Sequence, residues 1–198
     1  MKTKRSITMT IVLIIIALIA ILLILAATKP DHFRVERTIT INTSPEQIFP
    51  LINNFHQWTH WSPWEKKDPQ MQRHYSDDPS GTGATYAWEG DNNVGHGRME
   101  ITESTPYTKV GIALHFIKPF TAHNTATFTL TPTDNGTRVE WIMEGPNSFI
   151  SKLMHVFINM DKMVGKDFEA GLQQMKTVAE APERASVRYQ HCQQNDRD

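Results

Sequence analysis

The chain has 198 residues and is close to electroneutral, with 20 lysine and arginine residues against 21 aspartate and glutamate residues. Proteins whose main partner is a nucleic acid usually carry a basic excess, so we expect no nucleic-acid partner. The single cysteine, Cys192, excludes an intramolecular disulfide and a cysteine-based zinc site. Without an apolar N-terminal segment and a polar C-terminal tail, about 150 residues remain, which is enough for one domain with its own core.

The N-terminal segment from Ile11 to Ala27 contains no polar side chain. At about 1.5 Å per residue it spans roughly 26 Å as a helix, and extension back to Ile7 brings it to the ~30 Å thickness of a bilayer core. The sequence therefore predicts a transmembrane helix over residues 7–27. A cleaved signal peptide is the alternative, although Leu25 stands where a cleavage site normally has a small residue.

Charged residues on either side of this segment indicate its orientation. The basic residues before it are Lys2, Lys4 and Arg5. By the positive-inside rule, residues 1–6 are expected in the cytoplasm and the rest of the chain on the periplasmic, or extracytoplasmic, side of a bacterial inner membrane. The basic residues that follow it, and weaken this bias, are Lys29, Arg34 and Arg37. We therefore predict a single-pass membrane protein with the lipid bilayer as one partner.

The segment after the predicted span begins a domain. Residues 28–32 are expected to link the span to a domain over residues 33–181. Apolar and polar side chains alternate over residues 33–42, as in a half-buried strand. The Ser-Pro pair at 44–45 is a helix start signal, so a short helix should follow, and a second helical turn is expected over residues 55–58.

Short alternating segments separated by turn residues fill the middle of the domain. The predicted strands cover residues 71–76, 84–89, 97–104, 109–117, 121–131 and 137–144. The Asn135-Gly136 pair between the last two strands is a strong hairpin signal. Consecutive strands with such short connections predict an antiparallel meander.

The C-terminal region changes to a helical period. Between Ser148 and Ala181, apolar residues recur every three or four positions, which predicts a long amphipathic helix that could break near residues 159–161. Residues 182–198 are polar and are predicted to be disordered. A sheet with one apolar face must bury that face, and only this helix is large enough to cover it. We therefore predict an α+β fold in which a curved antiparallel sheet wraps around the C-terminal helix and leaves a cavity between them.

Four motifs, in this order, resemble the START-like, helix-grip superfamily. They are TINTSPEQIF at residues 40–49, FHQWTHWSPW at 55–64, NGTRVEW at 135–141 and GKDFEAGL at 165–172. The branch that they resemble is the polyketide cyclase/dehydrase and lipid-transport group, SRPBCC, over residues 32–180. The resemblance implies an apolar ligand held between sheet and helix. Some members cyclise or dehydrate such ligands, but no catalytic residue set is shared across the group, so none is carried over.

Strand and helix periodicity predicts which side chains could line the cavity. The candidates are Trp58, Trp61, Tyr86, Trp88, Met99, Ile112, Leu114, Phe128, Trp141, Met143, Met160, Val164 and Phe168. Phe157 and Leu172 of the C-terminal helix are also expected to face inward. Ligand cavities are mainly apolar, and methionine repacks easily around a ligand. The alternative for each of these residues is a place in an ordinary core, and the tryptophans near residue 60 could simply plug its edge.

No convincing acid–base pair for catalysis emerges from the sequence. His56 and His60 lie four residues apart, which suits one helix face, but a metal site would need a third ligand. We therefore predict no catalytic residue, no metal and no cofactor, and favour binding of a hydrophobic small molecule or lipid. One alternative is a polyketide cyclase- or dehydratase-like enzyme, with His56, His60 and His96 as first candidates for its ionisable group. The other is an envelope protein-interaction module whose protein partner is unknown.

Overall fold

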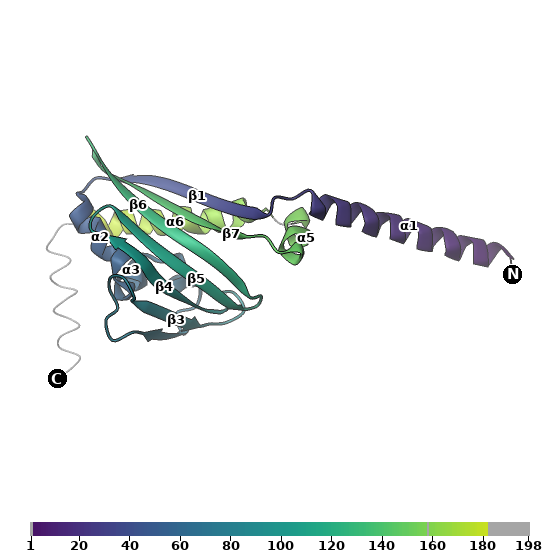
Figure 1. Cartoon of the computed structure of the whole chain (residues 1–198), viewed down its shortest axis with the longest axis horizontal. Helices are drawn as coiled ribbons and strands as arrows, with labels where there is room; N and C mark the ends of the chain where they lie inside the picture. Colours follow the sequence, from purple (N-terminus) through teal and green to yellow (C-terminus); the bar gives the residue numbers. More distant parts are fainter. Residues whose placement is uncertain (1, 158, 182–198) are drawn as a thin grey trace.

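The computed structural model describes residues 2–157 and 159–181, so the predicted tail at 182–198 lies outside the described residues. A curved antiparallel sheet wraps around a C-terminal helix, and an apolar N-terminal helix projects from one end of this domain (Figure 1). The predicted α+β, helix-grip-like fold is confirmed.

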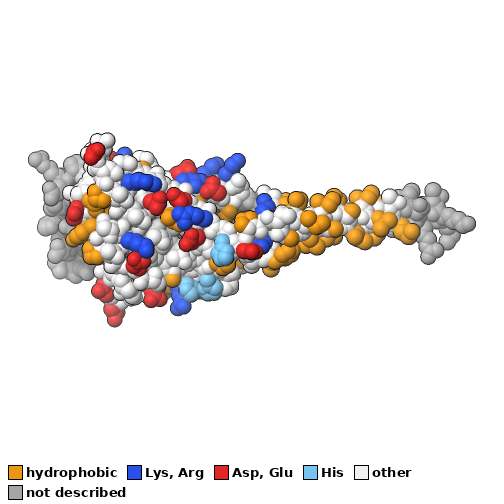
Figure 2. All heavy atoms as spheres, turned by 45° about the horizontal axis from the view of Figure 1, so that its top comes forward, with side chains coloured by type: hydrophobic (Ala, Val, Ile, Leu, Met, Phe, Trp, Pro, Cys, Tyr) orange, Lys and Arg blue, Asp and Glu red, His pale blue; other side chains and the backbone are white. Residues whose placement is uncertain are grey.

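The projecting helix, α1, runs from Lys2 to Ala27 and includes the predicted apolar segment. Its part from Met9 to Ala27 is long and apolar enough to cross a membrane. Signal sequences near an N-terminus share this length and composition. In the space-filling view, hydrophobic side chains run along α1, whereas charged side chains gather over the outer face of the domain (Figure 2).

The sheet follows the predicted meander closely. Its strands are β1 (His32–Ile41), β2 (Gln72–Tyr75), β3 (Thr85–Glu89), β4 (His96–Thr105), β5 (Lys109–Lys118), β6 (Ala122–Thr133) and β7 (Gly136–Pro146). Within the described residues the sheet has seven strands in the order β1-β7-β6-β5-β4-β3-β2, each antiparallel to its neighbour. The first strand, β1, therefore pairs with the last strand, β7, and forms one edge of the sheet. The meander from β2 to β7 forms the rest of the sheet.

Short helices between β1 and β2 cover one end of the concave face. They are α2 (Pro45–Asn53), η1 (Phe55–Gln57), α3 (Trp58–Trp61) and α4 (Pro63–Lys67). The indole nitrogens of Trp58 and Trp61 donate to the carbonyl oxygens of Ile52 and Leu51, at 2.9 and 2.7 Å. These buried bonds hold α3 against α2, because a buried indole N–H needs an acceptor.

The C-terminal region forms two helices rather than one. The helix α5 (Phe149–Phe157) is followed by α6 (Met160–Ala179), so the break considered near residues 159–161 is present. Asn159 caps α6 through a side-chain bond from the backbone N–H of Lys162 at 2.9 Å. The inward orientation expected for Phe157 is wrong: this side chain is 74% exposed, because α5 packs against α1 whereas α6 packs against the sheet.

Ring stacking and one ion-pair cluster hold α6 on the sheet. Trp141 of β7 lies between Phe168 of α6, at 3.9 Å between ring centroids, and Phe128 of β6, at 4.8 Å. At the start of α6, Arg37 of β1 donates to Asp161 at 2.9 Å and to Glu169 at 2.6 Å. The guanidinium crosses α6 at Gly165, where a Cβ atom would meet Arg37 Nη2 at 1.9 Å. These hydrogen bonds raise the pKa of Arg37 above its ordinary value.

Candidate ligand-binding cavity

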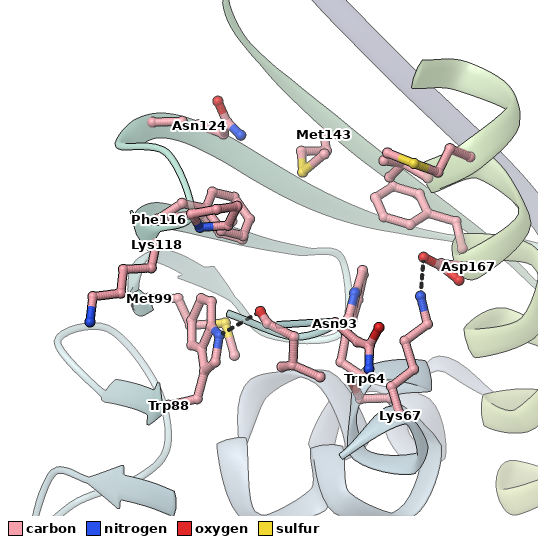
Figure 3. Close-up of a pocket in the computed structure, with 18 of the residues that line it drawn as sticks. Trp64, Lys67, Trp88, Asn93, Met99, Phe116, Lys118, Asn124, Met143 and Asp167 are labelled. Atoms are coloured by element: carbon pink, nitrogen blue, oxygen red, sulfur yellow. Dashed lines mark hydrogen bonds and ion pairs between the residues drawn. The ribbon is translucent and has the colours of Figure 1, made fainter. Parts of the chain in front are cut away.

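A cavity of about 470 Å³ lies between the sheet and α6 (Figure 3). This size falls within the ~300–1,000 Å³ range of small-molecule sites. Its walls are mainly apolar, and the methionines among the lining residues are Met71, Met99, Met143, Met154, Met160 and Met163. Because methionine is unbranched and repacks easily, such walls suit an elongated or variable apolar ligand.

Most of the predicted site residues line this one cavity. They are Trp58, Tyr86, Trp88, Met99, Leu114, Trp141, Met143, Met160, Val164 and Phe168. Trp61, Ile112 and Phe128 are not in the lining and lie in the packed core, where none is more than 1% exposed. For Trp61 the alternative of a ring that plugs the core therefore describes its position. Ligand contact by the lining residues stays a prediction.

The sequence did not single out the end of the cavity nearest α1. Lining residues there are Lys118, Pro119, Phe120, Ser151, Met154 and Met163. The Lys118-Pro119 pair was expected only as a turn between two strands, and the residues of α5 were predicted as part of the long helix. An exposed phenylalanine directly after a turn proline is the one signal that could have indicated this wall.

Trp88 forms a side wall whose position depends on a glycine. In Figure 3, Trp88 and Met99 lie on one side of the cavity, with Phe116 beyond them. A Cβ atom on Gly97, which faces Trp88 on the next strand, would meet the indole at 2.5 Å. Gly97 thus leaves the space in which the Trp88 ring lies across β4. The indole nitrogen is 3.4 Å from the carbonyl oxygen of Val94, which orients the ring along the wall.

A buried carboxylate lies within the mainly apolar lining. Glu65 of α4 is 8% exposed and accepts hydrogen bonds from Arg73 at 2.6 and 2.8 Å and from the hydroxyl of Tyr86 at 2.9 Å. Burial raises the pKa of Tyr86, and the adjacent Glu65 charge adds to this, so the phenol stays protonated and donates. Both carboxylate oxygens are thereby engaged. The sequence does not single out Glu65, because nothing in its neighbours indicates burial.

Polar residues form the rim of the cavity farther from α1. Lys67 of α4 forms an ion pair with Asp167 of α6 at 2.7 Å, drawn as a dashed line in Figure 3. Asn93 of the β3–β4 connection also belongs to the lining. The mouth of the cavity is therefore polar on one side, while the interior is mainly apolar apart from Glu65.

The histidines proposed for an enzyme do not reach the cavity. His56, His60 and His96 are absent from its lining. The His56 ring instead packs against Tyr75, with 4.2 Å between ring centroids. Within the described residues, no group of three or more His, Cys, Asp or Glu side chains could hold a metal ion.

Comparison with known proteins agrees with this architecture. Protein CV1439 from Chromobacterium violaceum is 13% identical, with a TM-score of 0.55 over 78% of this chain and 100% of that chain. Protein MLL2253 from Mesorhizobium loti is 17% identical, with a TM-score of 0.55 over 76% and 99%. SA2116 from Staphylococcus aureus, described as a protein of unknown function, is 12% identical, with a TM-score of 0.56 over 75% and 94%.

These identities are low enough that the solved structures show the fold alone. No curated protein matches the chain. The model of the family described as polyketide cyclase / dehydrase and lipid transport, however, matches residues 32–180, which include the sheet, α5 and α6. The chain therefore belongs to the polyketide cyclase / dehydrase and lipid transport family.

Proposed function

We propose that this chain is a membrane-anchored protein that binds a hydrophobic small molecule or lipid in the cavity between its sheet and α6. The observation that carries the proposal is the cavity itself: about 470 Å³ with mainly apolar walls. An apolar ligand of this size would gain packing contacts with these walls, which is the main attraction that such a site offers. The family description, which includes lipid transport, supports the same ligand class.

In this proposal α1 is the anchor. Its part from Met9 to Ala27 meets the length and apolarity that a bilayer requires. The basic residues at its start favour a cytoplasmic N-terminus and an extracytoplasmic domain. Because β1 begins at His32, only a few residues separate the span from the domain. A protein tethered in this way meets membrane lipids more often than any other apolar molecule.

The two carboxylates of the cavity lining support binding over catalysis. A general acid or base must be free to exchange a proton with the substrate. Glu65 is instead held by Arg73 and Tyr86, and Asp167 by Lys67. These pairs stabilise the walls, and a cyclase or dehydratase would have to break one of them to use its carboxylate.

A cavity-filling variant tests this function. Val164 of α6 lines the cavity, whereas Ala170 on the same helix is exposed. Native mass spectrometry of the full chain, extracted from bacterial membranes in mild detergent, should detect a bound apolar molecule in wild type and in the control Ala170→Trp. In Val164→Trp the bound fraction should fall at least tenfold. A bound fraction unaffected by Val164→Trp, or no bound molecule in any of the three proteins, would contradict the proposal.

A further inference from the structure

Helix α5 is held beside the last turn of α1. The two helices are in contact, and Ala26 of α1 is fully buried although the apolar span is otherwise almost entirely exposed. Asn147, just before α5, donates from Nδ2 to the carbonyl oxygen of Pro30 at 3.0 Å and from its backbone N–H to Asp31 at 2.7 Å. Lys152 of α5 also forms an ion pair with Asp31. The contacts thus fix α5 at the point where α1 meets the domain (Figure 1).

Exposed apolar side chains concentrate at this same end of the domain. They are Ile117, Phe120, Phe149, Ile150, Met154, Phe157 and Met163, here called the apolar rim. Among the described residues outside α1, the only other exposed large hydrophobic side chain is that of Tyr107. Phe157, the most exposed member of the rim, presents 74% of its surface. Scattered apolar residues are normal on a surface, but their confinement to one end marks an interaction surface.

The apolar rim borders the cavity. Phe120, Met154 and Met163 belong both to the rim and to the cavity lining. Phe120 comes from the β5–β6 connection, Met154 from α5 and Met163 from the first turn of α6, so three separate elements bring apolar side chains to one side of the mouth. The opposite side carries Lys67 and Asp167. The mouth therefore has one apolar side, toward α1, and one polar side, away from it.

We propose that the apolar rim lies in the interfacial layer of the bilayer that α1 crosses, so that the cavity opens onto lipid on that side. The inference rests on the proposed function, because α1 must span the membrane. Its strongest support is continuity: α5 contacts α1, and α1 is buried at Ala26, within the predicted span, so we place α5 at the boundary of the hydrocarbon layer. A helix at that depth with exposed Phe and Ile side chains buries them among the acyl chains. Lys118, exposed beside the rim, suits the phosphate groups of the lipids.

Depth-dependent quenching tests this arrangement in the full chain. Cys192 is first replaced by Ser, and single cysteines are introduced by Phe157→Cys, Ile150→Cys, Phe120→Cys, Leu18→Cys or Asp134→Cys. Leu18 is an exposed residue within the span, and Asp134 is exposed in the β6–β7 turn, away from α1. Each protein carries an NBD label and is reconstituted in vesicles of phosphatidylethanolamine and phosphatidylglycerol. Quenching is measured with 5-doxyl and 12-doxyl lipids and with aqueous iodide.

The inference predicts three distinct quenching patterns. Labels at 157, 150 and 120 should be quenched at least threefold more by 5-doxyl lipid than the label at 134, and at least threefold less by iodide. The label at 18 should respond most to 12-doxyl lipid. If 18 responds in this way but the rim labels behave like 134, the anchor stands and the inference is wrong. If 18 does not respond to lipid, the anchor fails and the inference with it. Rim labels shielded from both quenchers would mean that protein, such as a second copy, covers the rim, which also overturns the inference.

Discussion

The two ends of the sheet–helix layer differ in how the same strands are covered. At one end, Phe128 of β6 packs against Trp58 and Trp61 of α3, at 6.0 Å between ring centroids, and Phe128 and Ile112 of β5 are fully buried. Two residues farther along β5, Leu114 lines the cavity. Along β6 the inward side chains shrink from Phe128 to Ala126 and Asn124 as the cavity begins. Alternation thus determines which side chains face inward, whereas the helices above determine whether the space is filled.

Paired truncations at the two ends should give the largest difference in stability. Phe128→Ala should lower the free energy of unfolding by about 3–5 kcal/mol, because it opens a void in a packed core. Met143→Ala should cost at or below ~2 kcal/mol, the lower end for such a change, since its side chain already borders empty space. Urea unfolding of the detergent-solubilised full chain measures both. Equal costs would show that the cavity end is as tightly packed as the core.

The buried pair at the cavity wall should give the next largest effect. Glu65→Gln removes the charge that Arg73 faces and weakens the acceptor used by Tyr86. We expect a loss of about 1–3 kcal/mol in unfolding free energy, because a donor is left poorly satisfied. The double variant Glu65→Gln with Arg73→Met should recover part of this loss. If it recovers none, the pair is not what stabilises the wall.

Gly165 allows a smaller test at the cavity end of α6. Gly-to-Ala in a helix interior normally gains about 0.5–1 kcal/mol. Here the new Cβ would meet Arg37 Nη2 at 1.9 Å, so Gly165→Ala should be neutral or destabilising. In an Arg37→Ala background the same change should recover the gain of about 0.5–1 kcal/mol. Urea unfolding of the four proteins gives the coupling, and additive effects would contradict the contact.

The loss of stability at acidic pH should depend on the ion pair between Arg37 and Asp161, and this is the smallest effect that we expect. Hydrogen bonds from Arg37 hold the pKa of Asp161 below its ordinary value. Because the folded pKa is lowered, the pair contributes fully above pH ~4 and its contribution is lost as the pH falls through the folded pKa. Urea midpoints measured from pH 5 down to pH 2 should therefore fall less for Asp161→Asn than for wild type, and Arg37→Ala should have the same shallower slope. If the urea midpoints of both variants fall with pH as steeply as those of wild type, the ion pair does not contribute to stability.

Much of the fold could be predicted from sequence because its signals are local. The alternation in β4 to β7 and the Asn135-Gly136 turn determine strands and their order without tertiary information. The division of inward residues between core and cavity could not be predicted, because Ile112 and Leu114 have the same pattern and differ only in what covers them. Glu65 was missed for a related reason, since its partner Arg73 lies on the next strand and its other partner, Tyr86, on the one after. Phe157 continued the helical period and gave no sign that α5 turns toward α1.

Photolabelling of the full chain in membranes tests the central claim, that the cavity holds an apolar ligand, most directly. The probe is a long-chain fatty acid with a diazirine near its methyl end, added to vesicles that contain wild type, Val164→Trp or Ala170→Trp. The account predicts crosslinks on peptides with Met99 and Met143, which line the cavity and are at most 6% exposed. These crosslinks should persist in Ala170→Trp and be lost in Val164→Trp. Crosslinks confined to α1 and α5 in all three proteins would show that lipid touches the outside of this domain and does not enter it.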